Sequence, residues 1–186
     1  MSIRSLLSAV ILLASTLGAT AEGFVRNAGQ WDGTYAYKIN IPSGVAFIED
    51  DGIVFHLVDR QYNEAIHNRS DNIPSTVKHH AFKIEFVGSN PGIMYEEDRP
   101  ADHYLNYYLG NDESNWVSGL IPVSTVIYKE VYDGVDLHVM EFGGSLKYEF
   151  HLDAGVDPSI IKLRFNGLSD LDLLDNGDLL LRTELE

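Results

Sequence analysis

The sequence predicts an all-β fold, an antiparallel β-sandwich, with an open barrel-like sheet as the alternative. Aromatic and β-branched residues recur at every second position over short runs, which is the period of strands with one buried face. Apolar residues almost nowhere keep helical spacing over three turns. Glycine and acidic turns separate the runs, so neighbouring strands are expected to be antiparallel.

The first 21 residues are predicted to be a secretory signal peptide. Arg4 supplies the charge, an apolar stretch runs from Leu6 to about Leu17, and Ala19 and Ala21 give the small-x-small pattern of a cleavage site. A membrane anchor is less favoured, because the apolar run is shorter than the roughly 20 residues that span a bilayer. We expect cleavage after Ala21, export to the cell surface or medium, a single domain over 22–186, and no transmembrane segment.

The composition of the mature chain limits its chemistry. The sequence has no cysteine, which excludes disulfides and thiolate metal sites, so packing alone must hold the domain together. The formal charge is −15, and removal of Arg4 with the leader makes it one unit more negative. An acidic surface repels phosphate backbones, so nucleic acid is not an expected partner.

The first half of the domain predicts strands in a meander. In YAYKINI, residues 35, 37, 39 and 41 share one face, and turns at 42–44 and 50–52 lead into VAFIE and IVFHLV. Residues 59–78 are polar and without periodicity, as in a long loop. FKIEF follows, with Phe82, Ile84 and Phe86 inward. Residues 96–116 mix turn formers with aromatics, and we expect ordered, irregular structure there, with one short strand or helix.

The last third predicts two hairpins. VDLHVMEF and LKYEFHL are joined by Gly143 and Gly144, which can take the positive φ angles of a tight turn. Leu146, Tyr148, Phe150 and Leu152 are expected to face the core. Ile161, Leu163 and Phe165 continue the pattern in the next strand. The final hairpin, LDLLDNGDLLLR, contains Asn176-Gly177, the dipeptide most typical of a type I′ turn.

Polar residues concentrate in and just after the stretch VYDGVDLHVMEFGGSLKYEFHL, at residues 131–153. They are Asp133, Asp136, His138, Glu141, Glu149, His151 and Asp153. Strict alternation in the second strand is typical of a solvated sheet face. The sharper hypothesis pairs His138 with His151 across the hairpin as zinc ligands of a metal-dependent hydrolase, if a carboxylate joins them. The sequence contains no HExxH or similar compact ligand motif.

Two acidic clusters raise calcium as a second metal to consider. One consists of Glu49, Asp50 and Asp51, and the other of Asp170, Asp172, Asp175 and Asp178. Neither matches the spacing of a calcium-binding loop, and acidic residues are common in turns. We therefore expect no cofactor, with calcium as the alternative. The chain also lacks nucleophile-elbow and phosphate-loop motifs, so we do not expect an enzyme.

The candidate ligand-binding residues are four aromatics in one irregular stretch: Tyr104, Tyr107, Tyr108 and Trp116. Exposed aromatic faces stack on sugar rings, which makes extracellular polysaccharide a candidate partner. The alternative, which the usual burial of large aromatics favours, is that they plug the end of the sandwich with their polar tips hydrogen-bonded.

Several stretches together resemble a known family. They are FVRNAGQWDG, NYYLGNDESNW, VIYKEVYDGVDLHV, LKYEFHLDAGVDPSIIKLRFNG and LDNGDLLLRT, in this order, from about Phe24 to Thr183. The set is similar to an N-terminal domain of unknown function in secreted Bacteroidetes cell-surface proteins. The resemblance implies an extracellular β-rich module that precedes SBBP-type β-propeller repeats, PKD-like modules and a type IX secretion sorting domain. It supplies no catalytic residues.

These observations lead to one functional expectation and two alternatives. We expect a non-catalytic extracellular module with a structural or adhesive role, whose partners are downstream domains of the same polypeptide or extracellular polysaccharide or protein. Carbohydrate binding through the four aromatics is the first alternative. The metal-dependent hydrolase with His138 and His151 is the second.

Overall fold

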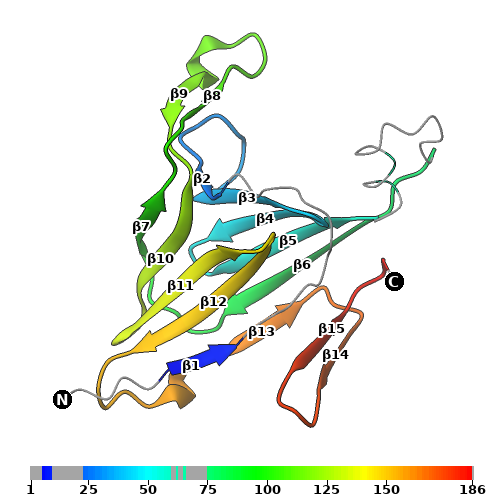
Figure 1. The fold of residues 1–186 in the computed structure, drawn as a ribbon. Helices are drawn as coiled ribbons and strands as arrows, with labels where there is room; N and C mark the ends of the chain where they lie inside the picture. Colours follow the sequence, from blue (N-terminus) through cyan, green and yellow to red (C-terminus); the bar gives the residue numbers. More distant parts are fainter. Residues whose placement is uncertain (1–5, 10–22, 60–61, 63–64, 66–74, 186) are drawn as a thin grey trace.

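The computed structural model describes residues 6–9, 23–59, 62, 65 and 75–185, and it has the predicted all-β fold (Figure 1). Its strands form two larger antiparallel sheets and two small two-stranded sheets. In the described residues no sheet closes into a barrel, and the arrangement is consistent with the predicted sandwich. Among the described residues, no helix has both the length and the apolar character needed to cross a membrane.

The first sheet has the strand order β1-β12-β11-β10-β7. Its strands are β1 (Leu6–Ala9), β12 (Ser145–Leu152), β11 (Val135–Phe142), β10 (Val123–Tyr132) and β7 (Met94–Pro100). The predicted β11–β12 hairpin is confirmed, with Phe142 opposite Ser145. Gly143 and Gly144 have φ angles of 59° and 81°, the two positive values that a type I′ turn requires.

The second sheet has the order β13-β6-β5-β4-β3-β2. Its strands are β13 (Leu163–Asn166), β6 (His79–Phe86), β5 (Gly52–Val58), β4 (Gly44–Glu49), β3 (Tyr37–Ile41) and β2 (Val25–Arg26). The predicted meander of β3, β4 and β5 is confirmed. Most of the loop predicted over 59–78 lies outside the described residues, as does most of the predicted leader.

The core lies between the two larger sheets and is built from alternating side chains. Phe82, Ile84 and Phe86 of β6 are buried as predicted. The inward side chains of β12, at positions 146, 148, 150 and 152, are buried as well. Each large apolar side chain that is buried in this way contributes about 1.5–3 kcal/mol. A bridge between Phe24 and Val123 links the start of the second sheet to β10 of the first.

Besides β1, which lies in the predicted leader, two strands of the first sheet were not predicted. β7 lies where irregular structure was expected, because it is an edge strand whose consecutive charged residues show no period of two. In β10, Val126, Ile127 and Tyr128 are buried in succession, and a bulge follows at Glu130, whose φ is 48°. The bulge shifts the register, which hides the alternation that identifies a strand.

The last hairpin consists of β14 (Asp170–Leu173) and β15 (Leu179–Arg182). The predicted type I′ turn is wrong. The Gly177 amide donates to the Leu174 carbonyl at 2.9 Å, and of the two predicted central residues only Gly177 has a positive φ, 88°. The side chain of Asn176 instead accepts from the Asp178 amide at 3.1 Å, which supports a longer loop.

The fourth sheet is a narrow extension that projects from one end of the sandwich (Figure 1). It consists of β8 (Leu105–Tyr107) and β9 (Val117–Leu120), with the short 3-10 helix η1 (Glu113–Asn115) between them. A second 3-10 turn, η2 (Pro158–Ile160), precedes β13. We call residues 104–120 the arm. The loop of residues 27–34, between β2 and β3, contacts the arm through Trp31 and Tyr107.

Candidate functional site

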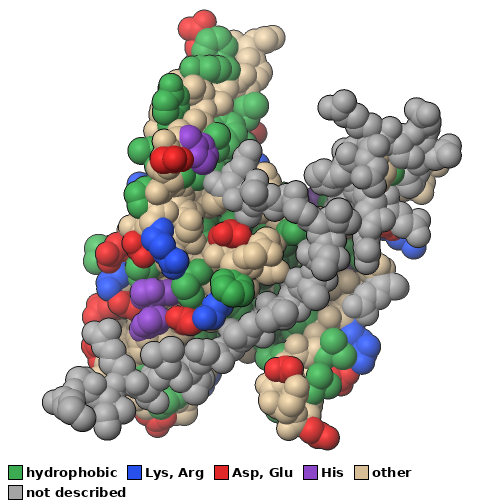
Figure 2. Space-filling view, viewed as in Figure 1, with side chains coloured by type: hydrophobic (Ala, Val, Ile, Leu, Met, Phe, Trp, Pro, Cys, Tyr) green, Lys and Arg blue, Asp and Glu red, His purple; other side chains and the backbone are tan. Residues whose placement is uncertain are grey.

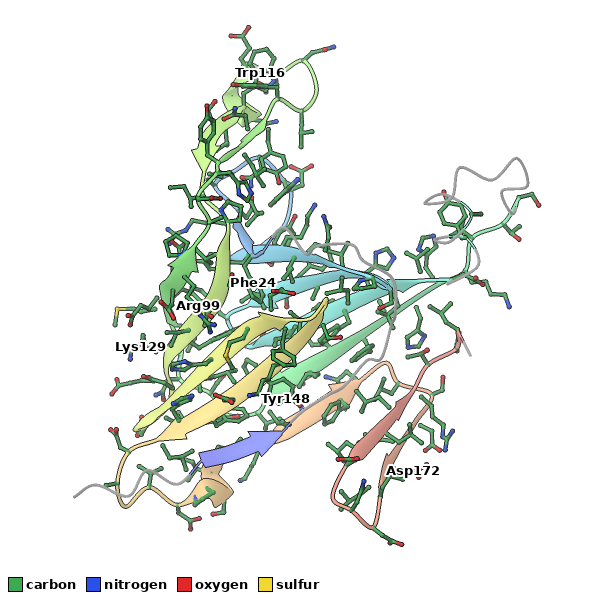
Figure 3. The ribbon with its side chains drawn as sticks, viewed as in Figure 1. Phe24, Arg99, Trp116, Lys129, Tyr148 and Asp172 are labelled. Carbon is green, nitrogen blue, oxygen red and sulfur yellow. The ribbon has the colours of Figure 1, made fainter. Side chains whose placement is uncertain are left out.

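The arm carries all four aromatic residues singled out in the sequence. Three of them are exposed: Tyr104 by 66%, Tyr108 by 59% and Trp116 by 41%. The interpretation of these three as a plug of the core is therefore wrong, because the hairpin that holds them leaves the sandwich. Figure 3 shows Trp116 at the outer end of the arm, and Figure 2 shows hydrophobic side chains along the same projection.

Tyr108 and Trp116 form a pair on the outer part of the arm. Their ring centroids are 5.5 Å apart at an interplanar angle of 73°, a favourable edge-to-face arrangement. The hydroxyl of Tyr108 lies 3.1 Å from Ser118 Oγ on β9. The Asp112 carboxylate accepts from the Ser114 amide at 3.0 Å and so caps η1. Local bonds therefore fix the directions of both rings although solvent surrounds them.

Tyr107 has a different partner, Trp31 in the loop of residues 27–34. The two ring centroids are 4.8 Å apart at 70°. The ammonium of Lys38 lies over the Trp31 ring, 4.1 Å from its centroid, as in a cation–π contact. Burial lowers the pKa of Lys38. Trp31 thus connects the arm to β3 of the sandwich.

The motif NAGQW explains how the loop holds Trp31 in place. Asn27 Nδ2 donates to the Trp31 carbonyl at 3.2 Å, and Asn27 Oδ1 accepts from the Gly29 amide at 3.2 Å. The buried Gln30 side chain accepts from the Ala28 amide and donates to the Arg26 carbonyl, both at 2.7 Å. Gly29 has a φ of 104°, which favours glycine at this position. The loop is therefore a tight turn that holds Trp31 as an aromatic anchor.

A cavity of about 430 Å³ opens between this loop and the arm. Its walls combine two aromatic rings with backbone and polar side chains. They are formed by Gly29, Gln30, Trp31, Asp32, Tyr35, Leu109, Gly110 and Asn115. The volume falls in the range of about 300–1,000 Å³ that is typical of small-molecule sites. The cavity is open to solvent and its walls are more polar than those of most such sites, which are mainly apolar.

The chemistry of the cavity suits a ligand with both apolar faces and hydroxyl groups. Asp32 and Asn115 offer oxygen acceptors, and the Asn115 amide also donates. Burial raises the pKa of Tyr35, and the charge of Asp32 adds to this effect, so the Tyr35 hydroxyl keeps its proton and can donate. The rings of Trp31 and Tyr35, with centroids 6.3 Å apart, offer apolar surface.

His138 and His151, the hypothetical zinc ligands, lie side by side. Their ring centroids are 3.9 Å apart at 18°, a face-to-face stack between β11 and β12. Histidine binds zinc in the plane of its ring at about 2.0–2.1 Å, and two stacked rings direct their nitrogens along parallel lines. One ion cannot satisfy both rings in this arrangement. His151 Nε2 lies 3.4 Å from Glu149 Oε2, in an ion-pair contact without hydrogen-bond geometry.

The acidic residues of the same segment stabilise the sheet. Asp136 accepts from the Glu130 amide at 2.8 Å and pairs with Lys129, which supports the bulge of β10. Burial alone would raise the pKa of Asp136, but these two partners hold it below its usual value. Glu149 pairs with Lys147 at 2.6 Å. The solvated-face interpretation therefore accounts for both carboxylates.

The two acidic clusters also have protein partners. Lys83 Nζ lies 2.8 Å from Glu49 and 2.6 Å from Asp51, and Tyr95 donates to Asp50 at 2.8 Å. In the last hairpin, Arg182 lies 3.1 Å from Asp172 and 3.6 Å from Asp170. In the part of the chain that the structure describes, no group of three or more His, Asp or Glu residues is arranged to hold a metal ion.

Trp31, Tyr35 and Asp32 are the site residues that sequence reasoning did not select. More than 70 positions separate Trp31 from Tyr107 in the chain, so only the fold brings them together. The cluster WDGTY, with two aromatics and an acid around a glycine, was the available signal.

Comparison with known protein families assigns the domain. DUF7948, a domain of unknown function, matches residues 24–186, which include the second sheet, every strand of the first sheet except β1, the loop of residues 27–34 and the arm. The chain belongs to the DUF7948 family. No curated protein and no solved structure matches this DUF7948 chain. The cavity, the loop and the arm are therefore all parts of the DUF7948 domain itself.

Proposed function

We propose that this chain is a non-catalytic carbohydrate-binding module of an exported protein, with an adhesive role. The observation that carries the proposal is the cavity of about 430 Å³ beside the arm, where Trp31 and Tyr35 meet Asp32 and Asn115. A sugar ring has an apolar face that packs on aromatic rings and hydroxyl groups that pair with polar side chains.

The exposed aromatics extend this site along the arm. Tyr104, Tyr108 and Trp116 lie outside the cavity, where they would contact further units of a polymer. A cavity that holds one unit and an adjacent aromatic surface together favour a chain over a free monosaccharide. The proposed ligand is therefore an extracellular polysaccharide.

Export supports the same function. The proposed leader, cleaved after Ala21, would place the domain outside the cytoplasm, where polysaccharides are accessible. The resemblance to N-terminal domains of secreted Bacteroidetes proteins, which precede propeller repeats and a sorting domain, supports a cell-surface location. Mass spectrometry of the exported protein should find Glu22 as its first residue. A retained leader would contradict this part of the proposal.

Retention on insoluble polysaccharides tests the binding function. Trp116→Ala and Tyr108→Ala should each weaken retention by about tenfold, because stacking on an aromatic ring contributes on the order of 1–2 kcal/mol. The melting temperature should stay unchanged because both side chains are exposed. Phe142→Ala is the matched control: Phe142 is an aromatic with 65% exposure on the β11–β12 hairpin, outside the arm.

Asp32→Asn tests the cavity separately from the arm. This change keeps the size of the side chain and removes its charge, so affinity should fall while the melting temperature holds. If none of the polysaccharides is retained by the wild type, or if Phe142→Ala weakens retention as much as Trp116→Ala, carbohydrate binding at the arm is contradicted.

The proposed binding uses no cofactor. Calcium was the alternative raised by the acidic turns, and it predicts that a chelator would abolish retention. We expect retention to be the same with and without chelator, because Lys83, Tyr95 and Arg182 already pair with these carboxylates. A hydrolytic activity that a single carboxylate substitution removes would contradict the non-catalytic assignment.

A further inference from the structure

The outer edge of β12 differs from the opposite edge of the same sheet. On one side β12 pairs with β11, and on the other it pairs with β1, from Leu6↔His151 to Ala9↔Tyr148. This places β1 alongside only part of β12. The strand itself contains no proline, glycine or bulge. Such an edge offers a row of backbone donors and acceptors to any extended segment.

The edge at β7 shows the contrast. It contains Glu96, Glu97, Asp98 and Arg99 in succession and ends at Pro100. Arg99 also has a φ of 55°, which interrupts the extended backbone. Consecutive charges, a proline and a local distortion are the features that keep an edge strand from pairing with another chain. β12 has none of these three features beyond alternating charges on one face.

Processing would expose the β12 edge. β1 lies within the proposed leader, so cleavage after Ala21 removes the strand that covers it. Without β1, the first sheet keeps β7 and β10–β12 and the second sheet keeps all of its strands, which carry the buried core described above. The family match also begins at residue 24. The mature chain therefore retains the sandwich and gains a free edge.

We propose that two mature copies of the domain pair through their β12 strands, antiparallel, to form one continuous sheet across a twofold axis. This rests on the proposed export. The axis passes through Tyr148, which faces Tyr148 of the second copy. The same register places Leu146 opposite Phe150, so apolar residues stay on the core face. On the outer face it places Lys147 opposite Glu149, twice per dimer.

The hydrogen-bonding pattern of the strand permits this register. The two-residue turn at Gly143-Gly144 makes Phe142 and Ser145 a hydrogen-bonded pair, so odd-numbered residues of β12 direct their backbone groups to β11. Leu146, Tyr148 and Phe150 then direct theirs to the free edge. In the proposed dimer, even-numbered residues of one β12 strand therefore lie opposite even-numbered residues of the other. This is the arrangement that an antiparallel hydrogen-bond ladder requires.

Charge decides against neighbouring registers. A shift that centres the axis on Glu149 would place two like carboxylates opposite each other, which is destabilising. The register centred on Tyr148 instead gives two Lys147–Glu149 pairs between copies. Within one chain the same two residues already lie 2.6 Å apart, so both side chains are on one face and near the edge.

Sedimentation analysis of the chain from Glu22 to Glu186, at physiological ionic strength, tests the dimer. The wild type should be in concentration-dependent equilibrium between monomer and dimer. Lys147→Glu and Glu149→Lys should each weaken the dimer by about tenfold, because each creates two like-charged pairs. An equimolar mixture of the two variants should restore dimerisation, since every Glu then faces a Lys of the other copy.

The mixture separates the proposal from a loss of folding. Each single variant breaks the Lys147–Glu149 pair within its own chain, and mixing cannot repair that pair. Restoration on mixing therefore reports contact between copies. The double variant K147E/E149K should also dimerise.

A monomeric wild type, or a dimer that neither substitution weakens, would overturn the proposal. A monomer that binds a peptide of residues 2–9 would also overturn it. In that case the β12 edge would be open, but a second copy of the domain would not occupy it. Failure of the proposed export is detected in a different experiment: the protein produced from the full chain would retain its leader. The result with the chain from Glu22 is unaffected by that failure.

Discussion

Tyrosines of the sandwich and tyrosines of the arm have opposite environments. Tyr37 of the second sheet contacts Tyr95 of the first edge to face, and Tyr95 contacts its cross-strand neighbour Tyr128 in the same way, with centroids 5.5 Å and 5.0 Å apart. Each hydroxyl donates to an acceptor, respectively Glu97 at 2.9 Å, Asp50 at 2.8 Å and the Glu49 carbonyl at 3.0 Å. On the arm, Tyr104 and Tyr108 are exposed to solvent.

This contrast shows that partners, and not residue type, separate the buried structural tyrosines from the exposed tyrosines of the arm. Burial raises the pKa of Tyr37 to about 12, and the hydrogen bond to Glu97 contributes to the shift. Its phenol is thus held neutral and fully engaged. The exposed aromatic rings of the arm remain accessible to solvent. The arm itself contacts the sandwich at few points.

The largest expected difference between the two regions is in stability. Tyr128→Ala should lower the free energy of unfolding by about 3–5 kcal/mol, because it removes a fully buried ring. It also removes the hydroxyl that donates to the Glu49 carbonyl at 3.0 Å and lies 3.2 Å from the Gly52 carbonyl. Tyr108→Ala should change the same quantity by less than about 0.5 kcal/mol. Urea denaturation of both variants checks this, and equal losses would refute the distinction.

An intermediate effect is expected where the two regions meet. Tyr107→Ala should cost about 1 kcal/mol, because it removes the edge-to-face contact with Trp31. Hydrogen exchange should then increase at the amides of β8 and β9 while the strands of the sandwich keep their protection. Uniformly faster exchange throughout the domain would mean that the arm is an integral part of the core.

The smallest expected effect concerns the outer face of the first sheet. Burial lowers the pKa of His138, and the nearby His151 lowers it further, while Asp136 and Glu149 act in the opposite direction. The unfolded chain, with an ordinary histidine pKa near 6.5, therefore takes up the proton first as the pH falls. His138 thus opposes folding below about pH 6.5 and not above it.

Thermal unfolding at pH 7.5 and pH 5.5 measures this contribution. The wild type should lose stability toward the lower pH, and His138→Gln should lose less over the same interval. Tyr104→Ala, on the arm, is the control and should follow the wild type. An identical pH dependence in His138→Gln would show that the stacked pair is not responsible.

Much of the sandwich follows from local patterns. Residues 146–152 alternate strictly, and the register that follows from Gly143-Gly144 places every inward side chain correctly. Prediction fails where the alternation is interrupted. β10 contains a bulge at Glu130, and β7 is an edge strand with charges on both faces. In the last hairpin, the side chain of Asn176 competes with the turn that its dipeptide favours.

The candidate site was only half predictable. Clustering in the sequence identified Tyr104, Tyr107, Tyr108 and Trp116, because neighbouring residues stay close in space. The wall of the cavity that contains Trp31 comes from the loop of residues 27–34, which is distant from the arm in the sequence. Hydrophobic periodicity predicts strands, but it does not predict which loops meet at the end of a sheet. Exposure is equally non-local: it depends on whether the hairpin folds back onto the sandwich, which its own sequence does not specify.

The positions of Trp31 and Trp116 have a practical consequence. The sequence contains only these two tryptophans, one in the wall of the cavity and one on the arm. Indole emission therefore reports on the proposed site alone, whereas the ten tyrosines report largely on the rest of the domain. Without any label, titration of a ligand into the proposed site can thus be followed by indole emission.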